Sequence, residues 1–356
     1  MKNIAATIIF DGAALNRDEK IGGNIQSIKK LNVEGSLKSF ISRPAIRHYL
    51  FNTLVKAHPE DWKPSKVVER GSGEKKVLQF DITQDDILSS AELDAFGYMF
   101  TIEKEMSITR KAPVGITKAI SIGNYNQDMV FYANHDLVQR ANQDGLNITP
   151  NPFQREEHQS LYKLSFTIDT EIFGKDVWVV RNKPKYDSKN KELSIEIENK
   201  NLKKIKNAIN NSNDTYEIEE NNKKIGTIKI KSINNAYKIT FELDDAIKKK
   251  RIKQILDAIH NGLVSHSSGE DNTIVPLFMI AGEVTVPSPV FHSYLDVVGG
   301  KIIGLNDCLN NSWLSGDISF IHKTDRLKAD IDNDRITYDW SEFIGQLGLG
   351  EKICQS

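Results

Sequence analysis

The opening residues constrain the fold of this chain most strongly. Residues 3–10 (NIAATIIF) are nearly all apolar or small and show little alternation between apolar and polar side chains. A strand that is covered on both faces has this pattern, whereas a strand with one solvated face alternates. The sequence therefore predicts a buried central strand at the start of the domain, followed by a loop over residues 11–30 with Gly12, Gly22 and Gly23 as breaks.

A second pattern, between residues 31 and 54, predicts an amphipathic helix. Ser42 is a suitable N-cap, and Pro44 falls in the first turn, where a missing N–H costs nothing. Arg43 and Arg47 are four residues apart and would share one face, on which guanidinium groups can bind phosphates. A basic helical face is, however, often only solvated. The apolar positions that would face the core are Ala45, Ile46, Tyr49, Leu50 and Leu54.

Later patterns complete a regular order of elements. We expect a helix or turn at 91–100, strands over 108–123 and 160–180, a hairpin at 225–243 around Asn234 and Asn235, a basic helix at 246–260 and a strand at 273–286. The coarse order is strand, helix, strand, strand, helix, strand, with long inserts. This order predicts an α+β fold, an elaborated ferredoxin-like or RNA-recognition palm.

Charge and composition allow nucleic-acid binding without demanding it. The formal net charge is −1, which argues mildly against a nucleic-acid-binding protein. Local charge weakens this objection, because residues 29–47 hold five cations and one acid. The two cysteines, Cys308 and Cys354, are too few and too distant for a zinc site or a disulfide framework, which fits a reducing cytoplasm. We expect a cytoplasmic chain without a signal peptide or membrane span.

The chain carries none of the common catalytic motifs. Gly22 and Gly23 are not followed by the GK[ST] of a phosphate-binding loop, and neither HExxH nor GxSxG occurs. The eight histidines are scattered, and His48 has no partner in the sequence that would make it a general base. We therefore expect no catalytic residues, no cofactor and no bound metal.

Several blocks, in their order along the chain, resemble the DevR-type backbone subunit of the type I-B CRISPR effector complex (Cascade), a branch of the RAMP superfamily. The resemblance covers most of the first 180 residues, returns weakly around 263–286 and is weakest over 181–238. The blocks are residues 2–12 (KNIAATIIFDG), 15–31, 35–51 (GSLKSFISRPAIRHYLF), 93–100 (LDAFGYMF), 110–122 (RKAPVGITKAISI) and 151–169.

The resemblance implies that three groups of side chains bind the backbone of CRISPR RNA, and that an inserted thumb wedges between its bases. The first group lies in the first loop and comprises Asn16, Arg17, Lys20 and Asn24. The second lies at the start of the first helix and comprises Ser36, Lys38, Ser39, Ser42, Arg43, Arg47 and His48. The third precedes the thumb and comprises Arg110, Lys111, Thr117, Lys118 and Ser121. The thumb itself would offer Phe131 and Phe153 for contact with bases, with Tyr125, Met129 and Tyr132 of the same insert as alternatives.

The resemblance also implies how the chain is divided. Residues 1–56 would form the first half of the palm, 91–122 its middle, 157–180 its later strands, and 246–356 its second half with a C-terminal segment. Residues 57–90 would be a finger-like insert, 123–156 the thumb and 181–245 a variable insert rich in Lys and Asn. Within that insert the polar run at 207–213 is typical of a low-complexity linker.

The implied function is that of a non-catalytic subunit that polymerises along CRISPR RNA for recognition of foreign DNA. The implied partners are CRISPR RNA, target DNA, further copies of the chain and other Cascade subunits, with no membrane. Two alternatives remain open. One is a metal-dependent endoribonuclease of the same superfamily that uses Asp18 or His48, and the other is a regulatory protein-interaction factor. Lys248, Lys249, Lys250 and Arg251 could contact DNA or another subunit, or could simply be solvated.

Overall fold

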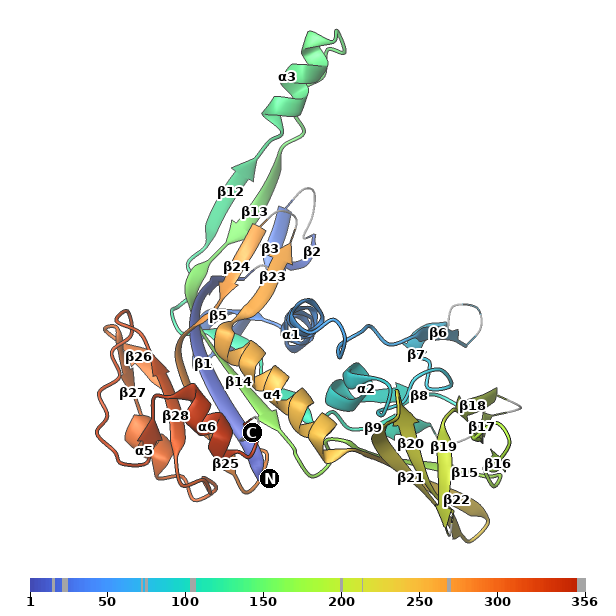
Figure 1. The fold of residues 1–356 in the computed structure, drawn as a ribbon. Coiled ribbons are helices and arrows are strands. Elements are labelled where there is room, and N and C mark those ends of the chain that lie inside the picture. Colours follow the sequence, from blue (N-terminus) through green and yellow to red (C-terminus); the bar gives the residue numbers. More distant parts are fainter. Residues whose placement is uncertain are drawn as a thin grey trace.

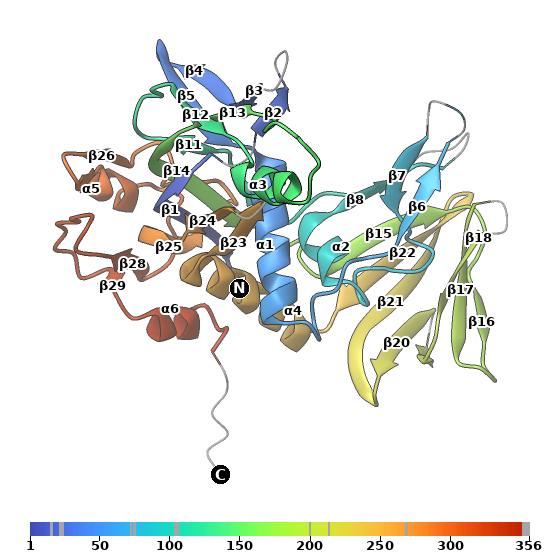
Figure 2. The same cartoon turned by 90° about the horizontal axis from the view of Figure 1, so that it is seen from above.

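The computed structural model describes residues 1–14, 17–20, 25–71, 73, 76–102, 107–198, 201–212, 214–267 and 270–350. A central sheet runs through the middle of the molecule, and a long arm projects from one end of it (Figure 1). A β-rich lobe and a C-terminal lobe flank the sheet on opposite sides (Figures 1 and 2). Among the described residues, no helix is both long and apolar enough to cross a membrane.

The predicted central strand is confirmed as β1 (Asn3–Ala13), whose first eight residues are all buried. It pairs antiparallel with β14 (Gln159–Ile168) on one side and with β25 (Pro276–Val284) on the other. The order in the central sheet is β29-β28-β25-β1-β14-β11-β5-β4, and β10 also pairs with β14. The remaining strands of this sheet are β4 (Lys30–Val33), β5 (Ser36–Ile41), β10 (Val114–Ile116), β11 (Ala119–Ser121), β28 (Ser319–Lys323) and β29 (Ile336–Thr337).

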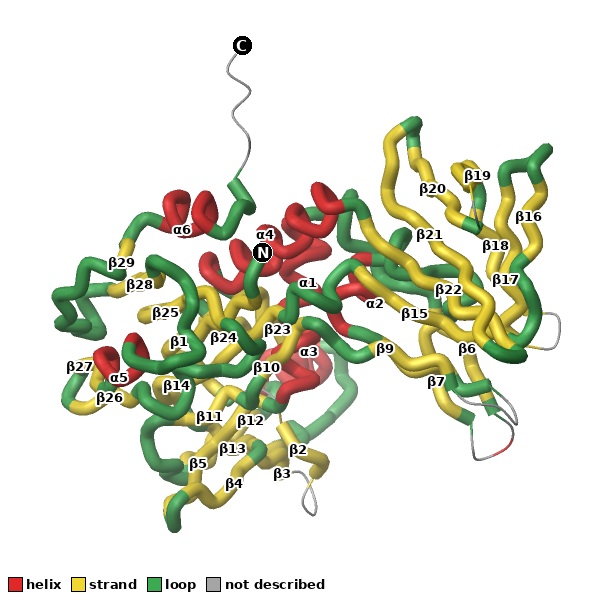
Figure 3. Tube along the Cα trace, turned by 90° about the horizontal axis from the view of Figure 1, so that it is seen from below, coloured by secondary structure: helices red, strands yellow, loops and turns green. Residues whose placement is uncertain are grey.

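Both faces of β1 are covered, which explains its unbroken apolar run. Ile4 and Ile8 point into a core formed with α1 (Arg43–Ala57) and α4 (Asp245–Asn261). Ile9, on the opposite face, packs into the core of the C-terminal lobe. That lobe contains β26 (Asp296–Val298), β27 (Lys301–Ile303) and α5 (Leu305–Leu309), while α6 (Trp340–Gln346) joins the first core. Figure 3 shows α1, α2 and α4 gathered between the central sheet and the β-rich lobe.

The helix predicted between residues 31 and 54 is only partly correct. Ser42 is the N-cap of α1 and accepts a hydrogen bond from the Ala45 N–H at 3.4 Å, so the predicted start is confirmed. The residues before it form the β4–β5 hairpin, in which Val33 pairs with Ser36. Glu34 and Gly35 have positive φ angles of 52° and 78°, a turn conformation that no helix accommodates. The apolar positions with helical spacing all lie after Ser42, in the part that is helical.

The described residues between 175 and 243 form a folded lobe, and β19 (Ala208–Ser212) occupies most of the linker predicted at 207–213, so that prediction is wrong where the structure describes the segment. One sheet has the order β15-β22-β21-β20-β19, and a second has the order β16-β17-β18. Alternating apolar residues build a separate core, but frequent Lys and Asn hide them in the sequence. The hairpin predicted around Asn234 and Asn235 is confirmed. The strands are β15 (Lys175–Val180), β16 (Lys185–Asp187), β17 (Glu192–Glu198), β18 (Asn201–Ile205), β19 (Ala208–Ser212), β20 (Thr215–Glu220), β21 (Lys223–Ile233) and β22 (Ala236–Leu243).

The arm that projects in Figure 1 is built from β12 (Asp128–Tyr132), α3 (His135–Gln143) and β13 (Phe153–Glu157). β13 also pairs in parallel with β3 (Ile25–Ile28), which pairs with β2 (Arg17–Lys20). The stretch predicted to be a loop over 11–30 is therefore largely strand where it is described. The remaining elements are β6 (Val67–Arg70), β7 (Val77–Phe80), α2 (Ala91–Phe96), β8 (Tyr98–Phe100), β9 (Ile108–Arg110), β23 (Leu263–Ser267) and β24 (Glu270–Ile274).

A half-buried histidine should make the stability of the fold dependent on pH. His292 Nδ1 lies 2.8 Å from Ser165 Oγ, which in turn lies 2.7 Å from Thr7 Oγ1. Burial, with a smaller effect of Lys163, lowers the pKa of His292 from 6.5 to about 4. The unfolded chain therefore binds a proton near pH 6.5 that the folded chain does not, and folding stability should fall as pH drops from about 6.5 to about 4.

Urea unfolding at a series of pH values in this range tests the prediction, with His292→Asn as the comparison. The variant should lose less stability on acidification than the wild type. Some loss should remain, because burial also lowers the pKa of His260 and His322. An equally steep loss in both proteins would contradict the assignment to His292.

Candidate nucleic-acid interface

The first turn of α1 is the clearest exposed cationic position among the predicted residues. Arg43 is the first residue of the helix and is exposed. The first turn of α1, which the structure describes in full, contains no acid. Because the first N–H groups of a helix have no intrahelical partner and carry partial positive charge, this end of α1 favours an anion.

The sheet brings Lys118 to the same place. β11 pairs with β5 so that Ala119 lies opposite Ile41, which puts Lys118 next to the end of β5 and the start of α1. Lys118 is exposed, and its Nζ lies 5.2 Å from the centroid of the Phe40 ring. We call Ser42, Arg43 and Lys118 the cationic corner.

Two further predicted residues lie close to the cationic corner along the chain. His48 lies further along α1 and is exposed, with its Nε2 2.9 Å from Asn52 Nδ2. Thr117 directly precedes Lys118, but its Oγ1 accepts a hydrogen bond from the Ser165 N–H at 2.9 Å. His48 is therefore available to a ligand, whereas Thr117 contributes mainly to the sheet.

Arg47 does not share the surroundings of Arg43, although helical spacing predicted that it would. Its guanidinium lies 3.4 Å from Glu92 Oε1 and 4.9 Å from the centroid of the Phe96 ring, both on α2. Burial lowers the pKa of Arg47, and the nearby Glu92 opposes this effect. Packing of α2 against this part of α1 therefore turns Arg47 into a structural residue.

Arg47→Ala should consequently lower stability more than it lowers affinity for RNA. The variant loses a partly buried ion pair and a cation–π contact, each worth roughly 0.5–1 kcal/mol. Thermal unfolding and RNA binding, measured on the same preparation, would test this. A large loss of RNA affinity at unchanged stability would instead show that Arg47 contacts RNA.

Three of the predicted polar residues, two from the helix-start group and one from the group before the thumb, are engaged inside the protein. Ser39 is buried in β5, and its Oγ lies 2.6 Å from Tyr162 Oη and 2.8 Å from His158 Nδ1. Ser121 is also buried, and its Oγ accepts from the Ser39 N–H and donates to the Gly123 carbonyl. Lys38 donates to the Ile122 carbonyl at 2.5 Å. Among them, Ser39 and Ser121 are too deeply buried to contact RNA, contrary to the prediction.

Ser36 is half-buried in β5, and its side chain lies near the exposed turn of the β4–β5 hairpin. Of the first-loop group, Asn16 and Asn24 lie outside the described residues, as do the side chains of Lys20 and Asp18. Arg17 is described, and its guanidinium binds Glu270 at 3.2 Å. Its charge is therefore already compensated within the protein.

A cavity of about 660 Å³ lies at the base of the arm beside Arg17. Carboxylates dominate the charged part of its lining, which would repel phosphate groups. Arg155 also binds Glu270, at 2.9 Å, so the guanidinium groups of Arg17 and Arg155 are both paired with a carboxylate of the protein. The acidic lining residues are Asp128, Glu156, Glu157, Glu270 and Asp271.

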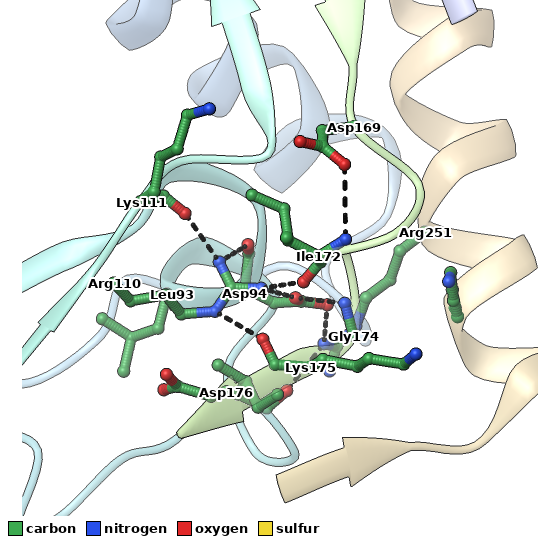
Figure 4. A network of polar contacts seen from close by, with 12 residues as sticks. Leu93, Asp94, Arg110, Lys111, Asp169, Ile172, Gly174, Lys175, Asp176 and Arg251 are labelled. Carbon is green, nitrogen blue, oxygen red and sulfur yellow. Dashed lines mark hydrogen bonds and ion pairs between the residues drawn. The ribbon is translucent and has the colours of Figure 1, made fainter. Parts of the chain in front are cut away.

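Arg110, predicted to bind RNA, instead lies in a buried ionic network around Asp94 (Figure 4). Its Nη2 lies 2.8 Å from Asp94 Oδ1, and the Asp94 side chain is completely buried. Arg251 of α4 binds the other carboxylate oxygen, Oδ2, at 2.9 Å. The Gly174 N–H also donates to Asp94 Oδ1 at 2.8 Å.

This network joins segments that are far apart in sequence. It links α2, β9, α4 and the turn that leads into β15, the first strand of the β-rich lobe. The side chains of Arg110 and Arg251 are buried against Asp94. Arg110 is therefore not placed for the predicted contact with RNA, and Arg251 is not placed for the alternatives left open for it, namely DNA, another subunit or solvent. Lys111, next to Arg110, is exposed, and its side chain points away from the network (Figure 4).

The two predicted aromatic residues of the arm differ in availability. The Phe131 side chain is 61% exposed on β12 and can stack with a base. Phe153 is half-buried and stacks on Tyr132, with ring centroids 5.4 Å apart. Arg155 lies over both rings, 5.0 Å from the Phe153 centroid and 5.4 Å from that of Tyr132. The sequence indicates Tyr132 and Phe153 as aromatic residues of this insert but not their stack with Arg155, because β12 and β13 pair across the long insertion that holds α3.

The described residues contain no cluster of three or more His, Cys, Asp or Glu side chains arranged to hold a metal ion. The candidate interface thus consists of the cationic corner on the sheet and the exposed Phe131 on the arm. The first offers charge for a phosphodiester backbone, and the second offers a ring for bases.

Residues 4–301 match the sequence model of the CRISPR-associated negative auto-regulator DevR/Csa2. The chain belongs to this family. The family predicted from the ordered sequence blocks is therefore confirmed, and the match extends through the β-rich lobe, where the resemblance was weakest. No curated protein sequence matches the chain.

Two solved structures resemble this DevR/Csa2 chain over nearly its whole length. One is titled "CRISPR RNA-guided surveillance complex", with 10% sequence identity and a TM-score of 0.48. The other is titled "CRISPR RNA-guided surveillance complex, pre-nicking", with 10% identity and a TM-score of 0.50. Each comparison covers 97% of this chain and 98% of the other. At 10% sequence identity, the match with a TM-score of 0.50 indicates a similar fold.

Proposed function

We propose that this chain is a CRISPR RNA-binding backbone subunit of a type I-B surveillance complex (Cascade). Several copies would lie along one guide RNA and hold its phosphates, while base pairing with DNA supplies sequence recognition. The observation that carries the proposal is the cationic corner, where Arg43 and Lys118 are exposed at a helix start in a member of a CRISPR-associated family.

The palm of this subunit would be an elaborated ferredoxin-like fold. The order β25-β1-β14-β11, with antiparallel neighbours, supports this assignment. Along the chain, these four strands and the helices α1 and α4 follow one another in the order β1, α1, β11, β14, α4, β25. This is the strand–helix–strand–strand–helix–strand order expected for that fold.

The arm would serve as the thumb, with Phe131 as the side chain that contacts bases. Its tip also exposes Leu137, Leu146 and Ile148, which would suit a contact with another subunit. The β6–β7 hairpin would be the finger-like insert. In the assembled complex the partners would be CRISPR RNA, target DNA, neighbouring copies of this chain and other Cascade subunits.

Co-expression with a CRISPR array and its neighbouring genes tests the proposal. We expect a large assembly that retains RNA containing one repeat–spacer unit, visible in the ratio of absorbance at 260 and 280 nm. A monomer free of nucleic acid in the presence of the array would contradict the proposal and favour a regulatory protein-interaction factor.

We propose no catalytic role for the chain. Incubation of the RNA-bound complex with Mg²⁺ distinguishes this from an endoribonuclease. The bound RNA should stay intact, whereas cleavage that Asp18→Ala or His48→Ala abolishes would establish the enzyme.

A further inference from the structure

The five-stranded sheet of the β-rich lobe has one buried face and one open face. Trp178, Ile230 and Ile239 point inward and are buried. Their neighbours along each strand point outward, because side chains alternate across a strand. The register places Lys238 of β22 opposite both Val179 of β15 and Lys231 of β21, so these three side chains form one outward row.

Lys231 and Lys238 are like charges that face each other directly. Side chains opposite one another in an antiparallel pair have Cβ atoms about 4.5–5.5 Å apart, and like charges in these positions destabilise the sheet. Both lysines are exposed, and among the described residues neither has an ion-pair partner. Two other lysines of β21 are compensated: Lys229 binds Glu242 at 2.7 Å, and Lys224 binds Glu217 at 3.1 Å.

Lys231 and Lys238 therefore place uncompensated positive charge near the turn of the β21–β22 hairpin. The hairpin of residues 223–243 contains five lysines and one acid, in a chain whose net charge is −1. Val177 and Val179 border the lysine row and are 43% and 54% exposed. The result is an open, cationic sheet surface whose internal repulsion an anionic ligand would relieve.

The shape and composition of this face select among anionic polymers. No aromatic side chain occurs on the outward face among the described residues of β15 and β20–β22; its neutral residues are aliphatic or hydroxyl-bearing, such as Val179, Ile233 and Thr240. Proteins that hold single strands usually stack bases on aromatic rings, which this face does not offer. A duplex presents regularly spaced phosphates and keeps its bases paired inside, so charge alone can bind it.

We propose that the Lys231–Lys238 face binds the phosphate backbone of duplex DNA without reading its sequence. This is a second nucleic-acid surface, distinct from the cationic corner. It lies on the β-rich lobe, whereas the cationic corner lies at the start of α1 on the central sheet (Figures 1 and 2). The two surfaces can therefore hold different strands at the same time.

The double variant Lys231→Gln, Lys238→Gln tests this surface in the full-length chain. Affinity for a short fluorescent DNA duplex of arbitrary sequence is measured over a range of salt concentrations. Loss of two phosphate contacts should reduce the slope of log K against log salt by about 1.8. The unfolding midpoint should stay the same or rise, since the variant also removes the repulsion between the two lysines. A purely structural role for the lysines would not give opposite effects on binding and stability.

The matched control is Lys223→Gln, Lys224→Gln, which removes the same charge from the same hairpin. Position 223 lies about 26 Å from position 231, at roughly 3.3 Å per strand residue. The control should leave duplex affinity nearly unchanged. An equal loss in both variants, no loss in either, or a loss confined to single-stranded RNA would overturn the proposal.

RNA retained from the CRISPR array is recorded on the same variants. The Lys231→Gln, Lys238→Gln protein should retain this RNA as the wild type does, because the cationic corner is unchanged. Failure of the wild type to retain RNA would count against the proposed guide-binding function and not against the duplex surface.

Discussion

Asp94→Asn should lower the free energy of unfolding by roughly 3–5 kcal/mol, the cost typical of breaking a buried ion pair from one side. The substitution keeps the size of the side chain but removes its charge. Arg110 and Arg251 would then remain buried without their counter-ion, as the side chains of both are less than 10% exposed. Urea unfolding monitored by tryptophan fluorescence would measure the change.

Asp245→Asn is the matched control for this prediction. Asp245 pairs with Lys249 four residues along α4, and its side chain is 72% exposed. Exposed pairs of this kind contribute about 0.3–0.5 kcal/mol, so the control should be nearly neutral. A loss below about 1 kcal/mol for Asp94→Asn would mean that the network is not the structural junction we infer.

Reversal of charge at the cationic corner, by Arg43→Glu with Lys118→Glu, should weaken binding of single-stranded guide RNA roughly a hundredfold. This estimate takes about 1.5 kcal/mol for each of two charge-assisted contacts. The salt slope should also fall, by about 0.7 for each lost contact with a single strand. Both residues are exposed, so the fold should be unaffected. Fluorescence anisotropy with a labelled CRISPR RNA would give both quantities.

Lys63→Glu with Lys66→Glu is the control for this pair. Both lysines are exposed and follow the other end of α1, a helix of 15 residues that spans about 22 Å. The control has the same net charge as the corner variant, so it separates a local contact from general attraction. Similar losses in the two variants, or wild-type affinity in the corner variant, would contradict the proposed interface.

The sequence predicted those features that depend on neighbouring residues. The Ser42 cap and the Asn234 turn are local signals, and the apolar run of β1 reports directly on burial. The ordered sequence blocks, each a short local pattern, were enough to identify the family. These signals suffice to place the central strand and the start of α1, and hence Arg43.

The residues that were misplaced depend on contacts between distant segments. Nothing in the residues next to Arg110 distinguishes it from an exposed arginine. It is buried because its guanidinium donates to Asp94 and to carbonyl groups of the turn at 172–175, which are distant in the sequence. Ser39 is buried because β11 joins β5 to β14, a strand that begins more than a hundred residues later and brings Tyr162 to the Ser39 hydroxyl. In the part of the β-rich lobe before the predicted hairpin, polar composition hid the alternation of Leu193 and Ile195 with polar residues.

The Asp94 network also determines how the two proposed surfaces are oriented. The Gly174 N–H and the Lys175 carbonyl, at the root of β15, are both held by it. The β-rich lobe therefore leaves the central sheet in a direction set by one carboxylate and two guanidinium groups. Two strands bound on the separate surfaces would keep a constant angle to each other. A substitution in this network, far from any phosphate, would change the geometry between guide and duplex while leaving every contact residue intact.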